Sequence, residues 1–282
     1  MIRIFSDSTC DLSKELIERY DITILPLHIL LGEEEFLDGV DITPDEIYKW
    51  SDEHKTTPKT SAVSIEDVMK AAEPYLDQGD EIISFSISDD MSTSGNVMHM
   101  AAAELEAEDR FHVINSANLS TGIGLLVVEA AIMAKNNRTA SQIVSEIEKL
   151  KPNVRASFVV DTLTYLYRGG RCNAVAAMAG GVLKLHPRIV VEDGAMNASK
   201  KYRGKIASVV MNYVKDMEKD LKNARPERVF ITHSGCKQET VEKVRAYLEE
   251  LGVFDEILET RAGGVISSHC GPGTLGVLYI AK

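Results

Sequence analysis

A histidine near the end of the sequence has neighbours that suggest a binding or catalytic role. His269 stands in the stretch SSHCGPG, between two serines and a Gly-Pro-Gly turn, with apolar runs typical of strands on both sides. An imidazole can donate a proton, accept one or contact an anion near neutral pH. Three interpretations stay open: a ligand group, a catalytic base, or a polar side chain at a strand end.

Small polar residues also gather after three predicted strands. The clusters are SDSTCD at 6–11, KTSAVS at 59–64 and SISDDMSTSGN at 86–96. Helix capping by Asp11 or Ser13 explains the cluster at 6–11 as well as a binding role does. In the cluster at 59–64, Ser64 is explained as a helix cap, whereas Thr60 and Ser61 are not. Ligands of open α/β sheets bind at the carboxyl ends of strands, and hydroxyl and backbone N–H groups bind anions. The clusters therefore suggest an anion site.

Two short basic stretches lie in the second half of the chain. They are RGGR, residues 168–171, and KKYRGK, residues 200–205. Arg203 could pair in bidentate fashion with a carboxylate or phosphate, although a solvated face is the ordinary account of such a cluster. Gly169 and Gly170 are typical of a Schellman-type helix end, which leaves Arg171 unexplained.

Composition and motifs argue against several classes of protein. Asp+Glu 43 against Lys+Arg 31 gives a formal net charge of −12, which disfavours nonspecific nucleic acid binding and adsorption to anionic lipid. There is no P-loop, GxSxG elbow, HExxH or CxxC pattern, and no apolar stretch of about 20 residues. MIRIFSDSTC lacks the apolar core of a signal peptide. We expect no metal site, no stable membrane insertion, and reduced cysteines in the cytoplasm.

To bring the polar clusters together, strands must end near one another. Strand-like runs such as IRIF, EIISFSIS and RFHVINS alternate with helical patterns over the first half of the chain. Helix starts are marked by Thr43 with Glu46, by Ser64, and by Thr139 with Gln142. This alternation predicts an N-terminal α/β domain with a mainly parallel sheet between helices, in three layers.

The pattern changes near residue 153. A strand (VRASFVVD) is followed by the helical patterns TLTYLYRGG and NAVAAMAGGVLKL, the second rich in small residues. A hairpin with a turn at Asp193 and Gly194 comes next, then helix, strand, helix and strand lead to His269. We expect a C-terminal α/β domain with a mixed sheet. The 282 residues suit two domains, 1–153 and 154–282.

These stretches, in this order, resemble the DegV family. The similarity lies in DSTCD at 7–11, Thr60–Ser61, SDDMSTS at 88–94, Gly169–Arg171, KKYRGK, and the HxGPGxxG turn at 269–276. It covers essentially the whole chain. This chain departs from the family in having Asp89 and Asp90 in the serine-rich loop, Thr93 in place of a glycine, and no proline in TSAVS. Acids pointing toward a carboxylate site would be unfavourable.

The resemblance implies a two-domain DegV-like fold with one long-chain fatty acid bound at the domain interface. It implies that Thr60, Ser61, Ser92 and His269 hold the carboxylate with Arg203 nearby, and that Arg171 faces a partner or an incoming phosphate. The protein would be a lipid-binding carrier without catalytic residues, metal or cofactor. It would present the carboxylate to a separate ATP-dependent fatty acid kinase subunit, giving an acyl phosphate for phospholipid synthesis.

Two other functions stay open on the residues alone. A hydrolase or acyltransferase would use Ser92 or Ser94 as nucleophile and His269 as base, although no nucleophile elbow supports it. A regulator would bind another small anionic ligand in a closed, polar cavity. The sequence does not specify the acyl chain, the kinase or the oligomeric state.

Overall fold

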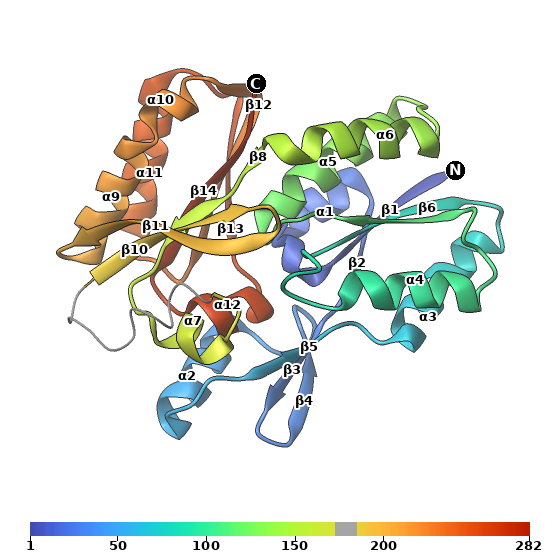
Figure 1. The fold of residues 1–282 in the computed structure, drawn as a ribbon, viewed down its shortest axis with the longest axis horizontal. Coiled ribbons are helices and arrows are strands. Elements are labelled where there is room, and N and C mark those ends of the chain that lie inside the picture. Colours follow the sequence, from blue (N-terminus) through green and yellow to red (C-terminus); the bar gives the residue numbers. More distant parts are fainter. Residues whose placement is uncertain (173–184) are drawn as a thin grey trace.

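The computed structural model describes residues 1–172 and 185–282, which form two large β-sheets with helices on and between them (Figure 1). The first sheet has four strands in the order β2-β1-β6-β7, and all its strand pairs are parallel. Its strands are β1 (Ile2–Asp7), β2 (Ile22–Leu25), β6 (Glu81–Ser86) and β7 (Phe111–Asn115).

Helices cover both faces of this parallel sheet. On one face lie α3 (Ile65–Leu76) and α4 (Ser94–Glu104); on the other lie α1 (Lys14–Tyr20), α5 (Thr121–Lys135) and α6 (Ala140–Leu150). The expected three-layer arrangement is confirmed. The predicted caps are also present: Thr43 and Thr139 start α2 (Pro44–His54) and α6 with capping boxes, and Ser64 accepts from the backbone N–H of Asp67.

The second sheet has seven strands and is mixed. Its order is β11-β10-β9-β14-β12-β13, and β8 pairs with one end of β14. Only β12 and β13 run parallel to each other; the other pairs are antiparallel. The strands are β8 (Val154–Arg155), β9 (Ser157–Val159), β10 (Leu185–Glu192), β11 (Ala195–Arg203), β12 (Ala224–Ser234), β13 (Glu256–Arg261) and β14 (Thr274–Ala281).

One face of the mixed sheet packs against three helices of the C-terminal half. They are α9 (Ile206–Asp216), α10 (Glu218–Leu221) and α11 (Gln238–Leu251). The predicted β10–β11 hairpin is confirmed, with Asp193 and Gly194 in its turn at φ values of +50° and +82°. Such positive φ values are what an Asp-Gly turn supplies between twisted strands.

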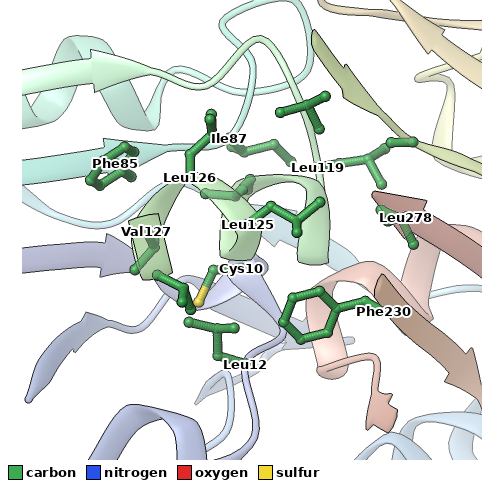
Figure 2. Packing of buried hydrophobic residues seen from close by; sticks show 14 of the residues in the cluster. Cys10, Leu12, Phe85, Ile87, Leu119, Leu125, Leu126, Val127, Phe230 and Leu278 are labelled. Atoms are coloured by element: carbon green, nitrogen blue, oxygen red, sulfur yellow. The ribbon is translucent and has the colours of Figure 1, made fainter. Parts of the chain in front are cut away.

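The other face of the mixed sheet packs against α5, so this helix lies between the two large sheets. Figure 2 shows Leu125 and Leu126 of α5 among side chains of both halves, with Cys10 and Phe85 on one side and Phe230 and Leu278 on the other. Almost every residue of α5 from its start to Ala131 is buried. A helix that is apolar all round requires such an enclosed position. The largest core cluster thus contains residues from both sides of position 153, and the boundary there stays a prediction.

A small third sheet lies below the other two in Figure 1 and was not predicted. It has the order β4-β3-β5, formed by β3 (His28–Leu31), β4 (Glu34–Leu37) and β5 (Lys59–Ser61). β5 has only three residues and β4 begins with two glutamates, so neither shows the apolar alternation by which strands are recognised. Here Thr60 pairs with Ile29 of β3.

The segment before the Gly-Pro-Gly turn differs from the expectation. Residues Gly264–Cys270 form the helix α12, and His269 lies in its last turn rather than on the turn that follows. The run GVISS looks strand-like because of its β-branched residues, but its N–H groups find carboxylate partners that hold it in a helix. The remaining elements are η1 (Ser8–Cys10), η2 (Lys151–Asn153) and α7 (Thr164–Gly169). The predicted helix NAVAAMAGGVLKL falls largely outside the described residues.

Candidate functional site

A cavity of about 370 Å³ lies where segments from both halves of the chain meet. Five of the residues predicted from the sequence line it: Thr60, Ser61, Ser92, Arg171 and His269. They come from β5, from the loop between β6 and α4, from the segment after α7, and from α12. Cavities of this size with a few polar groups are typical of small-molecule sites.

His269 and Thr60 are in direct contact in this cavity, with 2.9 Å between Nε2 and Oγ1. Among the described residues, Nδ1 of His269 is buried without a hydrogen-bond partner. Burial, and to a smaller extent the charge of Arg171, lowers the pKa of His269 to about 4, so the ring is neutral at pH 7. A neutral imidazole carries one N–H. With the proton on Nε2, the ring donates to Thr60 and leaves the threonine O–H free to donate to a ligand.

Two aspartate side chains from the N-terminal half hold the beginning of α12. Asp11 accepts from the backbone N–H of Gly263 at 2.8 Å, and Asp38 accepts from that of Gly264 at 2.6 Å. Burial raises the pKa of Asp11 to about 8, and it raises that of Asp38 as well. A Cβ on Gly264 would lie 2.6 Å from Cδ1 of Ile29, so helix and sheet approach this closely only with glycine at that position.

The end of α7 packs against the imidazole on its Nδ1 side. A Cβ on Gly169 would lie 2.3 Å from Nδ1 of His269, so a larger residue would displace the ring. Gly170 has a φ of +67° and caps α7 by donating its N–H to the carbonyl of Leu166, so the predicted glycine helix end is present, with the single bond of an αL cap. Arg171 follows, exposed at the edge of the cavity, and its Nη1 donates to the carbonyl of Gly169 at 2.7 Å.

The serine-rich loop contributes a hydroxyl and an acid to the cavity. The Oγ of Ser92 lies 2.9 Å from that of Ser94. Asp89 lines the cavity, but it is exposed and accepts from Nδ2 of Asn115 at 2.8 Å. Asp90 is exposed and does not line this cavity. One of the two acids by which this loop departs from the DegV pattern is therefore at the site, and it has a donor of its own.

The rest of the cavity is mainly apolar and leads toward the core. Its apolar walls are Leu27, Ala62, Ile87, Met91, Leu119, Met196, Val265, Ile266 and Cys270. Leu119, Ile266 and Cys270 also line a small neighbouring cavity whose walls include Phe158 and Leu278. Figure 2 shows Leu119 and Leu278 in the core beside α5. A polar end and an apolar end suit a ligand with one charged group and a hydrocarbon chain.

Arg203 is the one predicted carboxylate-binding residue that does not line this cavity. It is exposed at the end of β11, where the preceding Tyr202 is buried and side chains alternate between the faces. β11 contributes Met196 to the cavity, and Arg203 stands seven residues further on, about 23 Å along an extended strand. We therefore leave Arg203 out of the candidate site.

Sequence reasoning missed the residues that position His269. Asp11 was considered as part of the polar cluster at 6–11 and as a cap for the helix that follows, but Ser13 caps α1 and Asp11 reaches α12 instead. The sequence assigned no functional role to Asp38. The stretch RGGR drew attention to Gly169 in the sequence. Its contact with His269 could not be predicted, because the two residues are far apart in the sequence.

Comparison with known proteins identifies the family of this chain. A family model described as an uncharacterised protein of the DegV family matches residues 1–282. The chain belongs to the DegV family. A DegV domain-containing protein of Clostridium perfringens is 31% identical, over 100% of this chain and 99% of that protein. The family similarity thus extends over the whole chain, as its motifs suggested.

DegV proteins of known structure have the same fold. One from Thermus thermophilus, described by its fatty acid binding, superimposes with a TM-score of 0.91 at 28% identity, over 100% of this chain and 99% of that one. A stearic acid-binding protein from Eubacterium ventriosum has a TM-score of 0.87 at 31% identity, with the same coverage. Within residues 1–172 and 185–282, no helix has the length and apolarity needed to cross a membrane.

Proposed function

We propose that this protein binds a long-chain fatty acid in the cavity and presents its carboxylate to a separate ATP-dependent kinase. One observation carries the proposal: Thr60 and His269, in contact at 2.9 Å, lie at the polar end of a cavity whose other walls are mainly apolar. The structurally similar DegV proteins described as fatty acid-binding support the choice of ligand.

The polar end supplies the donors that a carboxylate needs once it leaves water. Thr60, Ser61 and Ser92 bring hydroxyl groups, and Arg171 brings a positive charge to the edge of the cavity. Without such donors, burial of a carboxylate costs several kcal/mol. His269 acts through Thr60, since its Nε2–H orients the threonine hydroxyl toward the ligand. The fatty acid carboxylate in turn gives the imidazole a nearby negative charge.

The apolar walls supply most of the affinity. Each methylene group that leaves water contributes about 0.8 kcal/mol. The tail would extend from Ile87 and Met91 past Leu119 toward the core between the two sheets. A long chain is thereby retained without a covalent bond to the protein.

The kinase step requires no nucleophile from this chain. The bound carboxylate is ionised at pH 7 and attacks the γ-phosphorus of ATP held by the partner. A carboxylate oxygen–phosphorus bond forms, the bond from the γ-phosphorus to the bridging oxygen breaks, and ADP leaves. Arg171, exposed beside the carboxylate end, would stabilise the charge on the transferred phosphoryl group.

The geometry offers the hydrolase interpretation no support. A serine nucleophile needs its base within hydrogen-bond reach, but His269 contacts Thr60, and Ser92 contacts Ser94. The regulator interpretation calls for a polar cavity, whereas this one is apolar over most of its lining. We keep both as outcomes that the following experiment can reveal.

Denaturing mass spectrometry of the natively purified protein should release a fatty acid. Delipidated protein should bind palmitate far more tightly than hexadecanol, and the His269→Ala variant should lose this preference while its fold survives. Acyl phosphate, trapped with hydroxylamine as the hydroxamate, should form only when ATP and an extract of the source organism are added, and His269→Ala should reduce it. Equal binding of palmitate and hexadecanol would contradict the carboxylate site. Ester hydrolysis by the purified chain alone would favour the hydrolase.

A further inference from the structure

A second and larger cavity is lined by residues of the mixed sheet and of the segments beside it. It is a groove of about 870 Å³ between β8, the β10–β11 hairpin, the end of α10 and the loop after β7. Four basic residues line it: Lys151, Arg155, Arg188 and Lys282. Its volume is within the range of small-molecule sites.

Arg188 on β10 is the unusual member of this group because it is partly buried and unpaired. Its Nε is inaccessible and has no hydrogen-bond partner among the described residues. The Nε of Arg228 is also unbonded, but Arg228 is neutralised by an ion pair with Glu129. Within the described part of the chain, Arg188 has no ion pair, and its one ring contact is Tyr213, 5.7 Å away. A buried N–H of a guanidinium without a hydrogen-bond partner costs free energy.

The acids nearby do not supply the missing partner. Asp216, which lies close enough to interact with Arg188, already accepts from Lys200 at 2.6 Å and from Tyr202 at 2.7 Å. Glu192, Asp193 and Asp220 also line the groove, but none forms an ion pair with Arg188. Among the described residues, no acid is therefore paired with this guanidinium.

Arg155 brings a second guanidinium toward the same point. It pairs across the strands with Tyr279 of β14, which lines the groove. Burial and the charge of Asp220 raise the pKa of the Tyr279 hydroxyl to about 12, and the charges of Arg188 and Arg155 oppose this shift, so both guanidinium groups and this acid lie near Tyr279. Arg155 donates from Nη1 to the carbonyls of Pro152 and Val154, and no ion pair to it is present in the described part of the chain.

We propose that this groove binds a small ligand through an oxyanion, a phosphate ester or a carboxylate, held by Arg188 and Arg155. The planar donor fork of arginine matches both groups. Val154 and Val190 offer apolar contacts to the body of the ligand. The bound oxyanion would give Arg188 the charge partner that the described part of the protein does not supply.

This site is separate from the fatty acid cavity, and the β10–β11 hairpin forms the wall between them. Met196 lines the first cavity, whereas Val190, Glu192 and Gly194 line the groove. The hairpin tip is held in place by Ser88, whose Oγ donates to the carbonyl of Gly194 at 2.7 Å. The proposal therefore stands independently of the function proposed for the first cavity.

The test uses two probes that share a ring and differ in the acid, phenyl phosphate and benzoate. The protein is first loaded with palmitate so that benzoate has no access to the fatty acid cavity, and binding is followed by NMR titration of the Tyr279 region. We expect saturable binding of at least one probe, and the tighter one identifies phosphate or carboxylate as the preferred group. Arg188→Met should weaken that binding more than about tenfold, the loss of a charge-assisted hydrogen bond.

Lys201→Met is the matched control, because it removes one exposed positive charge from the same hairpin. It should bind the probes as the unaltered protein does. Arg188→Lys keeps the charge but lacks the fork, and it should weaken binding even if Arg188→Met does not fold. No saturable change with either probe would overturn the proposal. Equal weakening by Lys201→Met would also overturn it, since binding would then reflect general surface charge.

Discussion

The contact between Gly169 and His269 offers a sharp test of the site. In Gly169→Ala, the new Cβ would stand 2.3 Å from Nδ1 of His269, and real contacts do not become that short. Because the backbone of α7 is fixed by its packing on α12, the imidazole has to move away, and its 2.9 Å contact with Thr60 is lost. Thr60 then no longer has its hydroxyl oriented toward the ligand.

The expected loss is that of one hydrogen bond to a charged group, about 1.5–3 kcal/mol, or about 10- to 150-fold in affinity for palmitate. Gly170→Ala is the matched control. Its Cβ would meet nothing within 4 Å, but its φ of +67° strains an alanine by about 1–2 kcal/mol. The control should lower the melting temperature and leave affinity unchanged. Titration calorimetry and thermal unfolding of delipidated proteins separate the two effects, and wild-type affinity in Gly169→Ala would refute the reasoning.

Three further outcomes follow from the site. Thr60→Val removes one hydroxyl at nearly constant volume and should weaken palmitate binding more than about tenfold, while hexadecanol binding changes little. Equal losses of affinity for both ligands would point to a packing defect. In the empty protein, NMR titration should show His269 neutral down to about pH 4, with a higher pKa once palmitate is bound, and a midpoint near 6.5 in the empty protein would contradict its burial. Burial raises the pKa of Asp11 from 3.8 to about 8, so its protonated form stabilises the fold at low pH and that contribution is lost as pH rises toward 8. Between pH 6.5 and 7.5 the unfolding free energy should therefore fall by about 1 kcal/mol relative to Asp11→Asn, measured by urea unfolding, and parallel pH profiles would refute the assignment.

The fold followed from the sequence where local patterns and tertiary structure agree. The parallel sheet comes from alternating apolar strands and capped helices, and the hairpin turn comes from Asp193 and Gly194. α12 and β5 escaped prediction because neither has a strong local signal. β5 exists because it pairs with β3, and α12 exists because acids far away in the sequence bind its first N–H groups.

The candidate site was partly predictable for a similar reason. Residues such as Thr60 and His269 stand out because no structural role explains them locally. Arg203 also stood out, but a basic side chain on an exposed strand end needs no ligand. What the sequence could not reveal is distance: Gly169 lies against His269, and Arg203 lies at the far end of the strand that carries Met196.

The position of His269 explains why buried acids are present in the N-terminal half. α12 has seven residues, too few to be stable alone, since isolated helices shorter than about 12–15 residues are marginal in water. Asp11 and Asp38 satisfy its first N–H groups at the cost of burying two carboxyl groups without a cation within the described residues. Apolar side chains at these two positions would cost less free energy to bury than carboxyl groups do, but they would leave those N–H groups without acceptors. The arrangement therefore fixes His269, from the C-terminal half, against β5 of the N-terminal half. The polar end of the cavity forms only when both halves are folded together.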